Sequence, residues 1–344
     1  MRIGKLTNEE LKEIVLSRLP KLSDRTLIGA NIGADCAWLD LGDKLLVTSS
    51  DPITAGGMQS GALSIHVSCN DIAACGIRPS AILTVLIAPP ECTKEDVVHI
   101  VEQASSTAKS LGVDIVGGHT EVSDSVNRFI VITTAFGIAD KDSPIPRGIA
   151  MPGDTLVMTK TAGIEGTWIA AMEHEAKLEG KVADDLISEA KTFISKISVV
   201  EDGVTACSLR DLNGAVNERG IAYSSTHLMH DVTEGGVLGA AYEMADFSGI
   251  GVSVDLSKVP VAPCTKAICE TMKIDPYRLI SSGSILVATS DPDALLEALA
   301  KKGIPACAIG AFTKEGFHLK DVDGKEIPFL PPQTDELYRM NAEN

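Results

Sequence analysis

The sequence predicts a two-domain α+β protein, and three observations support this fold class. The length of 344 residues fits two domains of about 100 to 200 residues each. In both halves, short apolar runs typical of strands alternate with longer stretches at helical spacing. A stretch with three prolines, DKDSPIPRGIAMP at 140–152, separates the halves. We place the boundary there, which gives an N-terminal domain at 1–150 and a C-terminal domain at 151–344.

The composition narrows the possible functions. Hydrophobic residues make up 44% of the chain and aromatic residues only 4%, which excludes a disordered chain and disfavours the aromatic platforms that bind single-stranded nucleic acid. The net charge of -17 gives no attraction for a polyanion, so we expect no nucleic-acid partner. An acidic protein that binds a nucleotide needs a divalent cation between its carboxylates and the phosphates, a role that suits Mg2+. The acidic surplus also serves solubility.

The cysteines and the N-terminus predict a cytoplasmic protein. The eight cysteines form no C-x-x-C pair and several stand in apolar runs, so we interpret them as buried thiols in a reducing compartment. The first residues, MRIGKLTNEELKEIV, lack the apolar segment of a signal peptide. The sequence contains no run of about 18 apolar residues, so we expect no membrane span.

The sequence of the N-terminal half predicts strands and helices, and the acids of interest lie at the ends of these elements. Thr7 and Glu10 form a capping box for a first helix, which Pro20 closes. Residues 27–47 predict a hairpin whose strands end near Asp35 and Asp51. The remaining elements expected in this half are helices at 62–75 and 93–111 and strands at 81–88, 113–116 and 127–139.

The motif GGHTEV follows the strand at 113–116. Gly117 and Gly118 permit a sharp turn or a close approach to a ligand. We therefore expect His119, Thr120 and Glu121 to face that ligand from a turn.

The C-terminal half contains a second glycine-rich motif. A strand at 154–160 leads into TAGIEGT, where Gly163 and Gly166 precede a helix at 167–175. Free amides at the start of that helix could meet a phosphate, with Lys160 as the cation; a solvated lysine at a strand end is the alternative interpretation. The further elements expected are helices at 184–197, 205–213, 263–272 and 292–301, a Gly-Ala-rich helix after Asp231, strands at 251–256 and 284–289, and a final hairpin of 306–312 with 317–320.

Five acids are the main functional signal: Asp71, which follows Asn70 near the end of an expected helix, and four acids in small-residue turns. We hypothesise that they converge on one site that holds Mg2+ and the phosphates of a nucleotide. Ordinary turn or cap residues are the alternative for each of them taken singly. The five are Asp35, Asp51, Asp71, Glu121 and Asp231.

Taken as a set, the motifs resemble one family. GADCA (33–37), TSSDPI (48–53), CNDIAACGIRP (69–79), GGHTEV (117–122), PGDTLVMTKTAGIEGT (152–167) and MHDVTEGG (229–236) occur in the order seen in the aminoimidazole ribonucleotide (AIR) synthetase superfamily. That superfamily includes thiamine-monophosphate kinase, selenophosphate synthetase, formylglycinamidine ribonucleotide synthetase and the hydrogenase maturation dehydratase HypE. The resemblance covers nearly the whole chain and is closest to HypE.

The resemblance implies a fold, a cofactor and a chemistry. The implied fold has an N-terminal sheet that joins a second copy in a shared barrel, and a C-terminal α/β sandwich domain. The implied cofactors are ATP and Mg2+, in a homodimer. The implied chemistry is activation, by phosphorylation, of an amide-like or carboxylate-like oxygen on a small-molecule or protein-borne acceptor, which needs no covalent protein nucleophile.

Matching the motifs assigns roles to individual positions. The catalytic positions are Asp71, His119 and Asp231. The metal ligands are Asp35, Asp51, Asp71 and Glu121. The nucleotide-binding positions are Asn70, Gly117, Gly118, Thr120, Lys160, Gly163 and Gly166.

Some residues depart from the family patterns. HypE resemblance implies a C-terminal cysteine that carries the group to be dehydrated, whereas this sequence ends in RMNAEN and its last cysteine is Cys307. His119 stands where related chains often have an acid, and Cys36 stands where the thiamine-monophosphate kinases have one. A non-catalytic ATP-binding paralogue, acting as a scaffold or sensor, is therefore the alternative to an enzyme.

Overall fold

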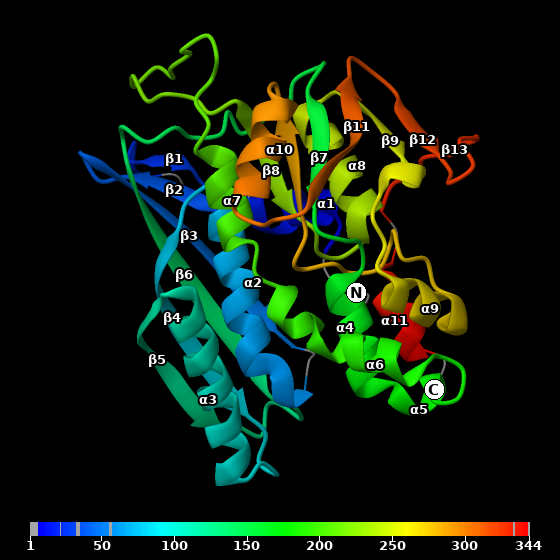
Figure 1. The fold of residues 1–344 in the computed structure, drawn as a ribbon. Helices are drawn as coiled ribbons and strands as arrows, with labels where there is room; N and C mark the ends of the chain where they lie inside the picture. The colour runs from blue at the N-terminus through cyan, green and yellow to red at the C-terminus, as the bar shows by residue number, and fades with distance from the viewer. Residues whose placement is uncertain (1–5, 21, 32–34, 55–56, 333, 343–344) are drawn as a thin grey trace.

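Two separate β-sheets form the framework of the molecule (Figure 1). The computed structural model describes residues 6–20, 22–31, 35–54, 57–332 and 334–342. The first sheet contains all strands up to Asp140, and the second contains those from Thr155 onward. This is the two-domain α+β architecture expected from the sequence.

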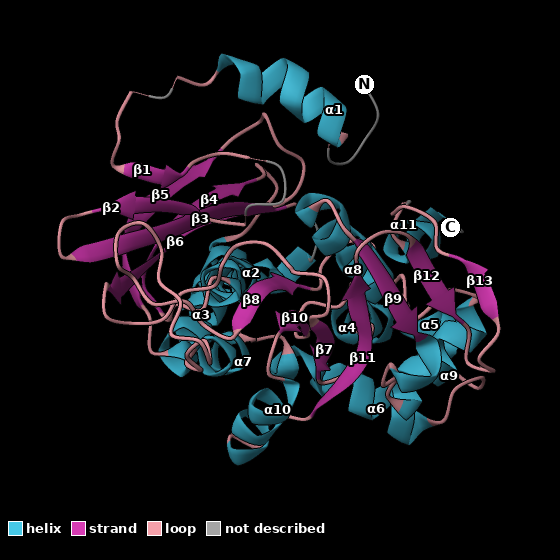
Figure 2. Cartoon of the chain, turned by 90° about the horizontal axis from the view of Figure 1, so that it is seen from above, coloured by secondary structure: helices cyan, strands magenta, loops and turns pink. Residues whose placement is uncertain are grey.

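The first sheet has the strand order β1-β2-β3-β6-β4-β5. Neighbouring strands are antiparallel, except that β4 and β5 run parallel because helix α3 makes the crossover between them. Helices α2 and α3 both pack on the same face of the sheet (Figure 2). The bounds are β1 Thr26–Ile28, β2 Ala37–Asp40, β3 Lys44–Ile53, α2 Ser60–Ala74, β4 Pro79–Ala88, α3 Lys94–Leu111, β5 Asp114–Val122 and β6 Ile130–Asp140.

Alternation along β3 shows how the sequence determines the two faces of this sheet. Leu45 and Val47 are completely buried against α2, whereas Leu46 and Thr48 are only half-buried on the other face. The same alternation places Ser49 and Asp51 on the face that α2 covers. Polar side chains are thereby brought to the helix at the end of an otherwise apolar strand.

The second sheet has the order β13-β12-β9-β11-β7-β10-β8. Helix α8 packs on one face, while α7 and α10 lie on the other. The bounds are β7 Thr155–Thr159, α4 Ile164–Glu173, α5 Glu175–Leu178, α6 Asp184–Lys191, α7 Val200–Cys207, β8 Thr226–Asp231, α8 Gly236–Ser248, β9 Gly251–Asp255, α9 Pro263–Met272, β10 Ile285–Thr289, α10 Pro292–Lys301, β11 Ala306–Thr313, β12 Phe317–Lys320, β13 Glu326–Pro328 and α11 Glu336–Ala342.

Helix α2 joins the two domains. It is buried around almost its whole circumference, because the first sheet lies on one side and α7 of the second domain on the other. The two helices approach so closely that a Cβ on Gly203 would lie 2.1 Å from the carbonyl oxygen of Ala73. One apolar cluster therefore continues from Leu45 in the first sheet to Leu299 on α10.

The N-terminal segment has the predicted capping box. The Thr7 amide donates to Glu10 Oε2 at 2.9 Å, and the Glu10 amide donates to Thr7 Oγ1 at 3.1 Å. The helix that follows begins as α1 Asn8–Glu10 and continues irregularly to Arg18. In Figure 2 it crosses beside the first sheet, apart from the helices that cover it.

Three expected elements were wrong. GGHTEV is no turn, because 114–122 form one continuous strand, β5. Residues 306–312 and 317–320 do not pair as a hairpin; β9 lies between β11 and β12 and hydrogen-bonds to both. The helix expected at 205–213 is α7, Val200–Cys207, and 208–213 form a loop. In each case the local sequence pattern indicated a regular element, but it could not specify the strand with which that element pairs or the residue at which it ends.

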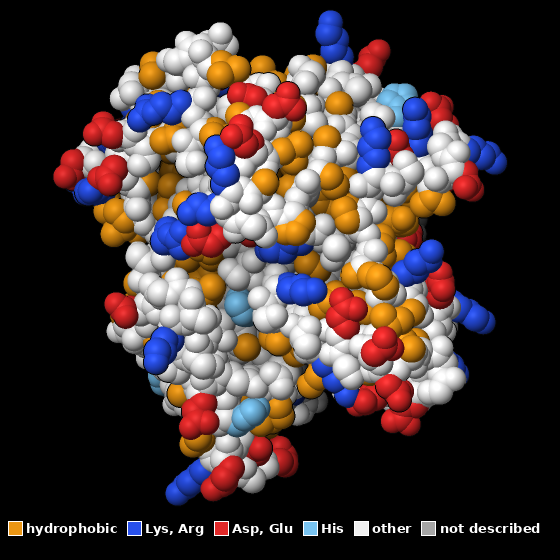
Figure 3. All heavy atoms as spheres, viewed as in Figure 1, with side chains coloured by type: hydrophobic (Ala, Val, Ile, Leu, Met, Phe, Trp, Pro, Cys, Tyr) orange, Lys and Arg blue, Asp and Glu red, His pale blue; other side chains and the backbone are white. Residues whose placement is uncertain are grey.

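Acidic and basic side chains are interspersed over the face shown in Figure 3. Within the described residues, no helix is both long and apolar enough to cross a membrane.

Candidate metal and nucleotide site

Asp51 and Asp71 meet where β3 faces helix α2. Ser49 Oγ lies 2.6 Å from Asp71 Oδ2 and 3.2 Å from Asp51 Oδ2, so one hydroxyl contacts both carboxyl groups. Asp71 is only 8% exposed. A pair of carboxyl groups this close binds a proton or a cation, since two unscreened negative charges there repel each other.

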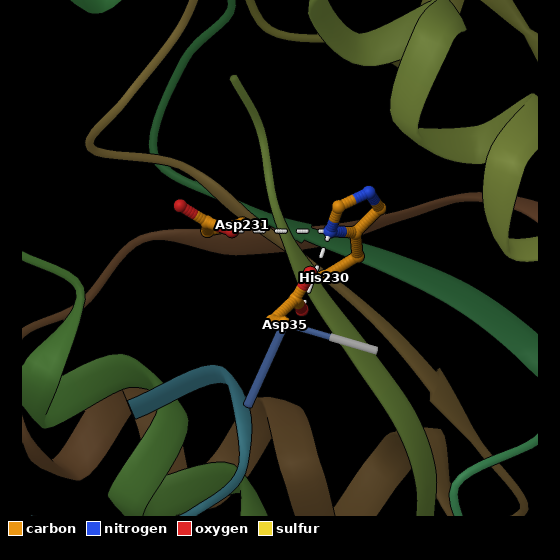
Figure 4. A group of neighbouring side chains, drawn as sticks. All are labelled: Asp35, His230 and Asp231. Atoms are coloured by element: carbon orange, nitrogen blue, oxygen red, sulfur yellow. Dashed lines mark ion pairs between the residues drawn. The ribbon is translucent and has the colours of Figure 1, made fainter. Parts of the chain in front are cut away.

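A second group joins the two domains at the end of β8. His230 Nδ1 lies 3.5 Å from Asp35 Oδ2 and 3.8 Å from Asp231 Oδ1, and Figure 4 shows this one ring nitrogen facing both carboxylates. The three residues can offer ligand atoms within 4.8 Å of one another. On its other side, His230 Nε2 lies 3.2 Å from Glu243 Oε2 on α8.

Electrostatics connect these two groups of acids. Burial is the largest cause that raises the pKa of Asp71 well above its usual value, and the charges of Asp231, Asp51 and Asp35 raise it further. Burial of the His230 ring favours its neutral form, but the Asp35 charge and hydrogen bonds to Asp35 and Glu243 overcome this and raise its pKa well above the usual value. The structure thus brings together four of the five predicted acids, from both domains.

The set of donors fits a hard divalent cation. Asp35, Asp51, Asp71 and Asp231 offer only carboxylate oxygens, and oxygen is the ligand that Mg2+ prefers. The cost of burying Asp71 among three other acids is what a divalent cation would offset. These four residues could therefore hold Mg2+, with Ser49 fixing the orientation of two of them.

Glu121 and His119 lie elsewhere in the same chain. The strand register aligns Asp51 with Thr133, Thr133 with Thr84, and Thr84 with Gly118. The row crosses three strand spacings, which is about 14 Å. His119 and Glu121 are offset by one and three residues from Gly118, so their side chains lie on the face opposite to Asp51. They contact each other instead, with His119 Nε2 3.1 Å from Glu121 Oε2, and both are exposed.

Gly117, Gly118 and Thr120 share this edge strand. Gly118 packs so tightly on β4 that a Cβ there would lie 1.8 Å from Thr84 O. With Thr120 and His119 the two glycines line a small cavity of about 240 Å³ between β5 and α3. Gly118 thus serves strand packing, and the cavity lies at the β5 edge of the helix-covered face, three strands away from Asp51.

The side chains of Asn70 and Lys160 form hydrogen bonds with other groups of the protein. Asn70 is completely buried; its Nδ2 donates to Ile197 O and its Oδ1 accepts from the Val199 amide, both at 2.9 Å. Lys160 Nζ donates to Ser198 O, Gly283 O and Asp202. Both residues hold the segment before α7 in place, and all three Lys160 donors already have protein acceptors.

Gly163 and Gly166 are likewise packing residues in the structure. The Ile164 amide donates to Ser281 Oγ and the Gly166 amide donates to Ile280 O, so both donors already have protein acceptors. A Cβ on Gly166 would lie 2.3 Å from Leu279. The start of α4 is therefore buried against the 279–281 loop, and the phosphate position expected there is filled by protein.

A cavity of about 1440 Å³ opens beside the acids. Its lining includes Asp35, the N-terminal segment, the β1 and β2 strands, Arg147 and Tyr223. Arg147 stacks on the Tyr223 ring at 4.7 Å and pairs with Asp211 at 2.9 Å. The cavity is large enough for a nucleotide or an acceptor next to Asp35.

Sequence reasoning missed two residues of this site. Ser49 precedes Asp51 by two positions, so strand periodicity places it on the same face and could have identified it. His230 is next to Asp231 in the motif MHDVTEGG, but nothing local indicates that Asp35 lies opposite it. That contact exists only in the folded chain.

Comparison with known proteins places the chain in a family. A model described as AIR synthase related protein, N-terminal domain, matches residues 33–139, and one described as AIR synthase related protein, C-terminal domain, matches 151–321. The chain belongs to the AIR synthase-related family. It is 29% identical over 339 residues to a putative hydrogenase expression/formation protein of Methanocaldococcus jannaschii, which covers 95% of this chain and 94% of that one.

HypE proteins are among the relatives of this AIR synthase-related chain. It is 26% identical over 275 residues to the carbamoyl dehydratase HypE of Cupriavidus necator, covering 78% of this chain and 71% of the relative. A crystal structure of hydrogenase maturation protein HypE in complex with ATP superimposes with a TM-score of 0.66 at 19% identity, over 97% of each chain. The structural similarity confirms the two-domain fold.

Proposed function

We propose that this protein is an ATP- and Mg2+-dependent enzyme that phosphorylates, and thereby activates, an oxygen of an acceptor. The observation that carries the proposal is the convergence of Asp35, Asp51, Asp71 and Asp231 from both domains beside a large cavity. The relatives named as carbamoyl dehydratase and the ATP-bound structural neighbour support the same chemistry.

Different residues of the site have different roles in this reaction. The four carboxylates hold the cation, which would screen the phosphate charges and polarise the phosphoryl group. Ser49 orients Asp51 and Asp71 through its hydroxyl. His230 positions Asp35 at the wall of the cavity. Asp71 is buried on the side of α2 that faces β3, which excludes water from that side of the carboxyl group.

The acceptor is an amide-like or carboxylate-like oxygen of a small molecule or of a protein-borne group. Phosphorylation turns such an oxygen into a leaving group, so positioning and charge neutralisation suffice without a protein nucleophile. The cavity beside Asp35 provides the space for it.

We further propose that the active form is a homodimer. The face of the first sheet opposite to α2 carries apolar side chains, of which Leu83 is 38% and Ile138 55% exposed. His119 and Glu121 lie on this face. A second copy placed against it would form the shared barrel and cover the exposed residues of β5.

Measurement of ATP binding with and without Mg2+ tests the proposal. Wild-type protein should bind ATP in a Mg2+-dependent manner, and Asp71→Asn should weaken binding at least tenfold because it removes a cation ligand. Asn is nearly isosteric and removes a buried charge, so the apo variant should unfold at the same temperature or higher. Asp140→Asn, an exposed acid at the end of β6, is the matched control. Equal affinity in a folded Asp71→Asn variant contradicts the site.

A non-catalytic ATP-binding paralogue is the second candidate. It is favoured by the pairing of Glu121 with His119 away from the four acids. ATP turnover discriminates the two. ADP release that depends on an added amide or carboxylate acceptor supports the enzyme, whereas ATP binding without ADP release from any acceptor supports the scaffold.

A further inference from the structure

A short hairpin of the second domain, residues 211–223, forms one wall of the large cavity. It lies between α7 and β8 in the chain, and Figure 1 shows this segment projecting from the body of the molecule. Its two arms pair at Val216 and Ala222, and the Gly220 amide donates to Asn217 O at 2.9 Å to close the turn. Residues 217–219, 221 and 223 line the cavity of about 1440 Å³.

The base of the hairpin is fixed to the segment that links the two domains. Arg147 Nη2 donates to Asp211 Oδ2 at 2.9 Å, and its guanidinium stacks on the Tyr223 ring at 4.7 Å. The Ile145 amide donates to Ala222 O at 3.0 Å. Side-chain and backbone contacts therefore hold both ends of the hairpin in place.

The tip of the hairpin reaches the first domain through an ion pair. Arg219 Nη1 donates to Asp40 Oδ2 at the end of β2. The other carboxylate oxygen, Asp40 Oδ1, lies 3.0 Å from Nζ of Lys141, which directly follows β6 of the first domain. Next to the tip, Ile221 is 1% exposed and belongs to the apolar cluster that contains Trp38. One ion pair and one buried side chain thus join the tip to the opposite wall.

Movement of the tip is inexpensive, because most of the hairpin is exposed. Leu212 is 75% and Val216 56% exposed, so the arms bury little apolar surface. Gly214 has a φ of +64°, and a Cβ there would meet no atom within 4 Å, which leaves the backbone room to rotate. A segment with few buried contacts opens at a small fraction of the free energy of global unfolding.

We propose that the 211–223 hairpin is a gate over the large cavity, hinged at its base and latched to the first domain by Arg219 and Asp40. In the closed form the hairpin joins the two domains across the cavity. When the latch releases, Ile221 leaves the cavity wall and the cavity opens to solvent. A nucleotide would enter and leave through the open form and be retained by the closed one. This role in ligand exchange rests on the proposed function, whereas the opening does not.

Alkylation of a thiol placed at Ile221 tests the opening without any ligand. In Ile221→Cys the buried thiol reacts with iodoacetamide only when the tip lifts, so the rate, measured by peptide mapping, reports the open fraction. Adding Arg219→Ala should raise that rate about two- to fivefold, the range for loss of an exposed ion pair. Loss of a nearby cation disfavours the thiolate, so the increase cannot come from a more reactive sulfur.

Lys141→Ala is the matched control, because it removes the other cation of Asp40 and leaves the hairpin pair in place. Its alkylation rate should equal that of Ile221→Cys alone, and Arg219→Lys should restore most of the slow rate. Asp40→Asn should speed the reaction from the other side of the latch. Cys92, half-buried and outside the cavity lining, is the internal reference. Equal rates with and without Arg219, or an Ile221→Cys thiol that reacts as fast as in an unfolded peptide, overturn the gate.

The rates of Mg2+–ATP binding test the gating of the proposed site separately. In Arg219→Ala the association and dissociation rate constants should both rise by the factor found for alkylation, with Kd nearly unchanged, because a gate limits entry and exit alike. Faster dissociation alone shows that the hairpin holds the nucleotide directly, and unchanged rates show that it does not limit exchange; either result overturns the gating. Wild-type protein that binds no ATP overturns the proposed function, while the alkylation result still stands.

Discussion

At the scale of single residues, helix α2 shows how three neighbouring polar side chains have different roles. Asn70 satisfies two backbone groups of the second domain, and Asp71 joins the acids. His66, one turn before Asn70, is 8% exposed, and its Nδ1 has no hydrogen-bond partner among the described residues. A buried imidazole without an acceptor favours the neutral form.

The pH dependence of stability should report on His66. Burial, and secondarily the charge of Lys160, lowers its pKa to about 4. In the unfolded chain it titrates near 6.5, so the unfolded state binds the proton first and stability falls as the pH drops from about 6.5 to 4. Between pH 7.5 and pH 5 this group should cost about 2 kcal/mol of unfolding free energy.

Urea unfolding of His66→Leu at both pH values measures this contribution. The variant should lose less stability than wild type on acidification, by about 2 kcal/mol. His99→Gln, an exposed histidine on α3, should behave as wild type. Equal pH sensitivity in His66→Leu and wild type would show that the ring is charged, or solvated, in the folded protein.

At the scale of elements, sequence patterns predicted most helices and strands but few of their pairings. The capping box at Thr7 and Glu10 and the helix α9 at Pro263–Met272 follow from local signals. The insertion of β9 between β11 and β12 does not, because strand pairing depends on long-range contacts. GGHTEV reads as a turn from its glycines, yet Gly118 is required in a strand by the close approach of Thr84.

The candidate site was predictable to a similar extent. Acids at element ends identified Asp35, Asp51, Asp71 and Asp231, which lie together in the fold. Lys160 and Gly163 were expected at a phosphate because a strand, a glycine and a helix follow one another. Sequence could not show that Lys160 donates to Ser198 O and Asp202. Nor could it show that the Ile164 amide, next to Gly163, donates to Ser281 Oγ, since these acceptors come from distant segments.

The end of strand β7 provides a prediction at this scale. Lys160 adopts a left-handed φ of +55° and ties β7 to Asp202 on α7 and to the loop at Gly283. Lys160→Met leaves the 2% exposed Asp202 carboxylate without its cation and should destabilise the protein by about 3 to 5 kcal/mol. Asp202→Asn in the same chain should recover part of this loss.

Denaturant unfolding of the two single variants and the double variant measures the coupling. ATP affinity measured on the same variants tests the alternative role of Lys160. A folded Lys160→Met protein of near wild-type stability and much weaker ATP binding would show that the lysine contacts phosphate after all.

At the scale of the whole molecule, the two faces of the first sheet differ in how far they are covered by the rest of the chain. One face is covered by α2 and α3, and through α2 it continues into the core of the second domain. The other face presents half-buried and exposed apolar residues on β4 and β6. Strand β5 is exposed along its whole length, which leaves an unpaired edge that proteins normally protect.

A homodimer built on this face explains both features and can be tested by light scattering after gel filtration. Wild type should elute with twice the chain mass. Leu83→Glu with Ile138→Glu should give a folded monomer, because two charges in the centre of an interface cannot be solvated there. Val98→Glu, at an exposed valine of α3 on the opposite face, should remain dimeric. A monomeric wild-type protein, or a double variant that stays dimeric, would place the second copy elsewhere and leave His119 and Glu121 outside the interface.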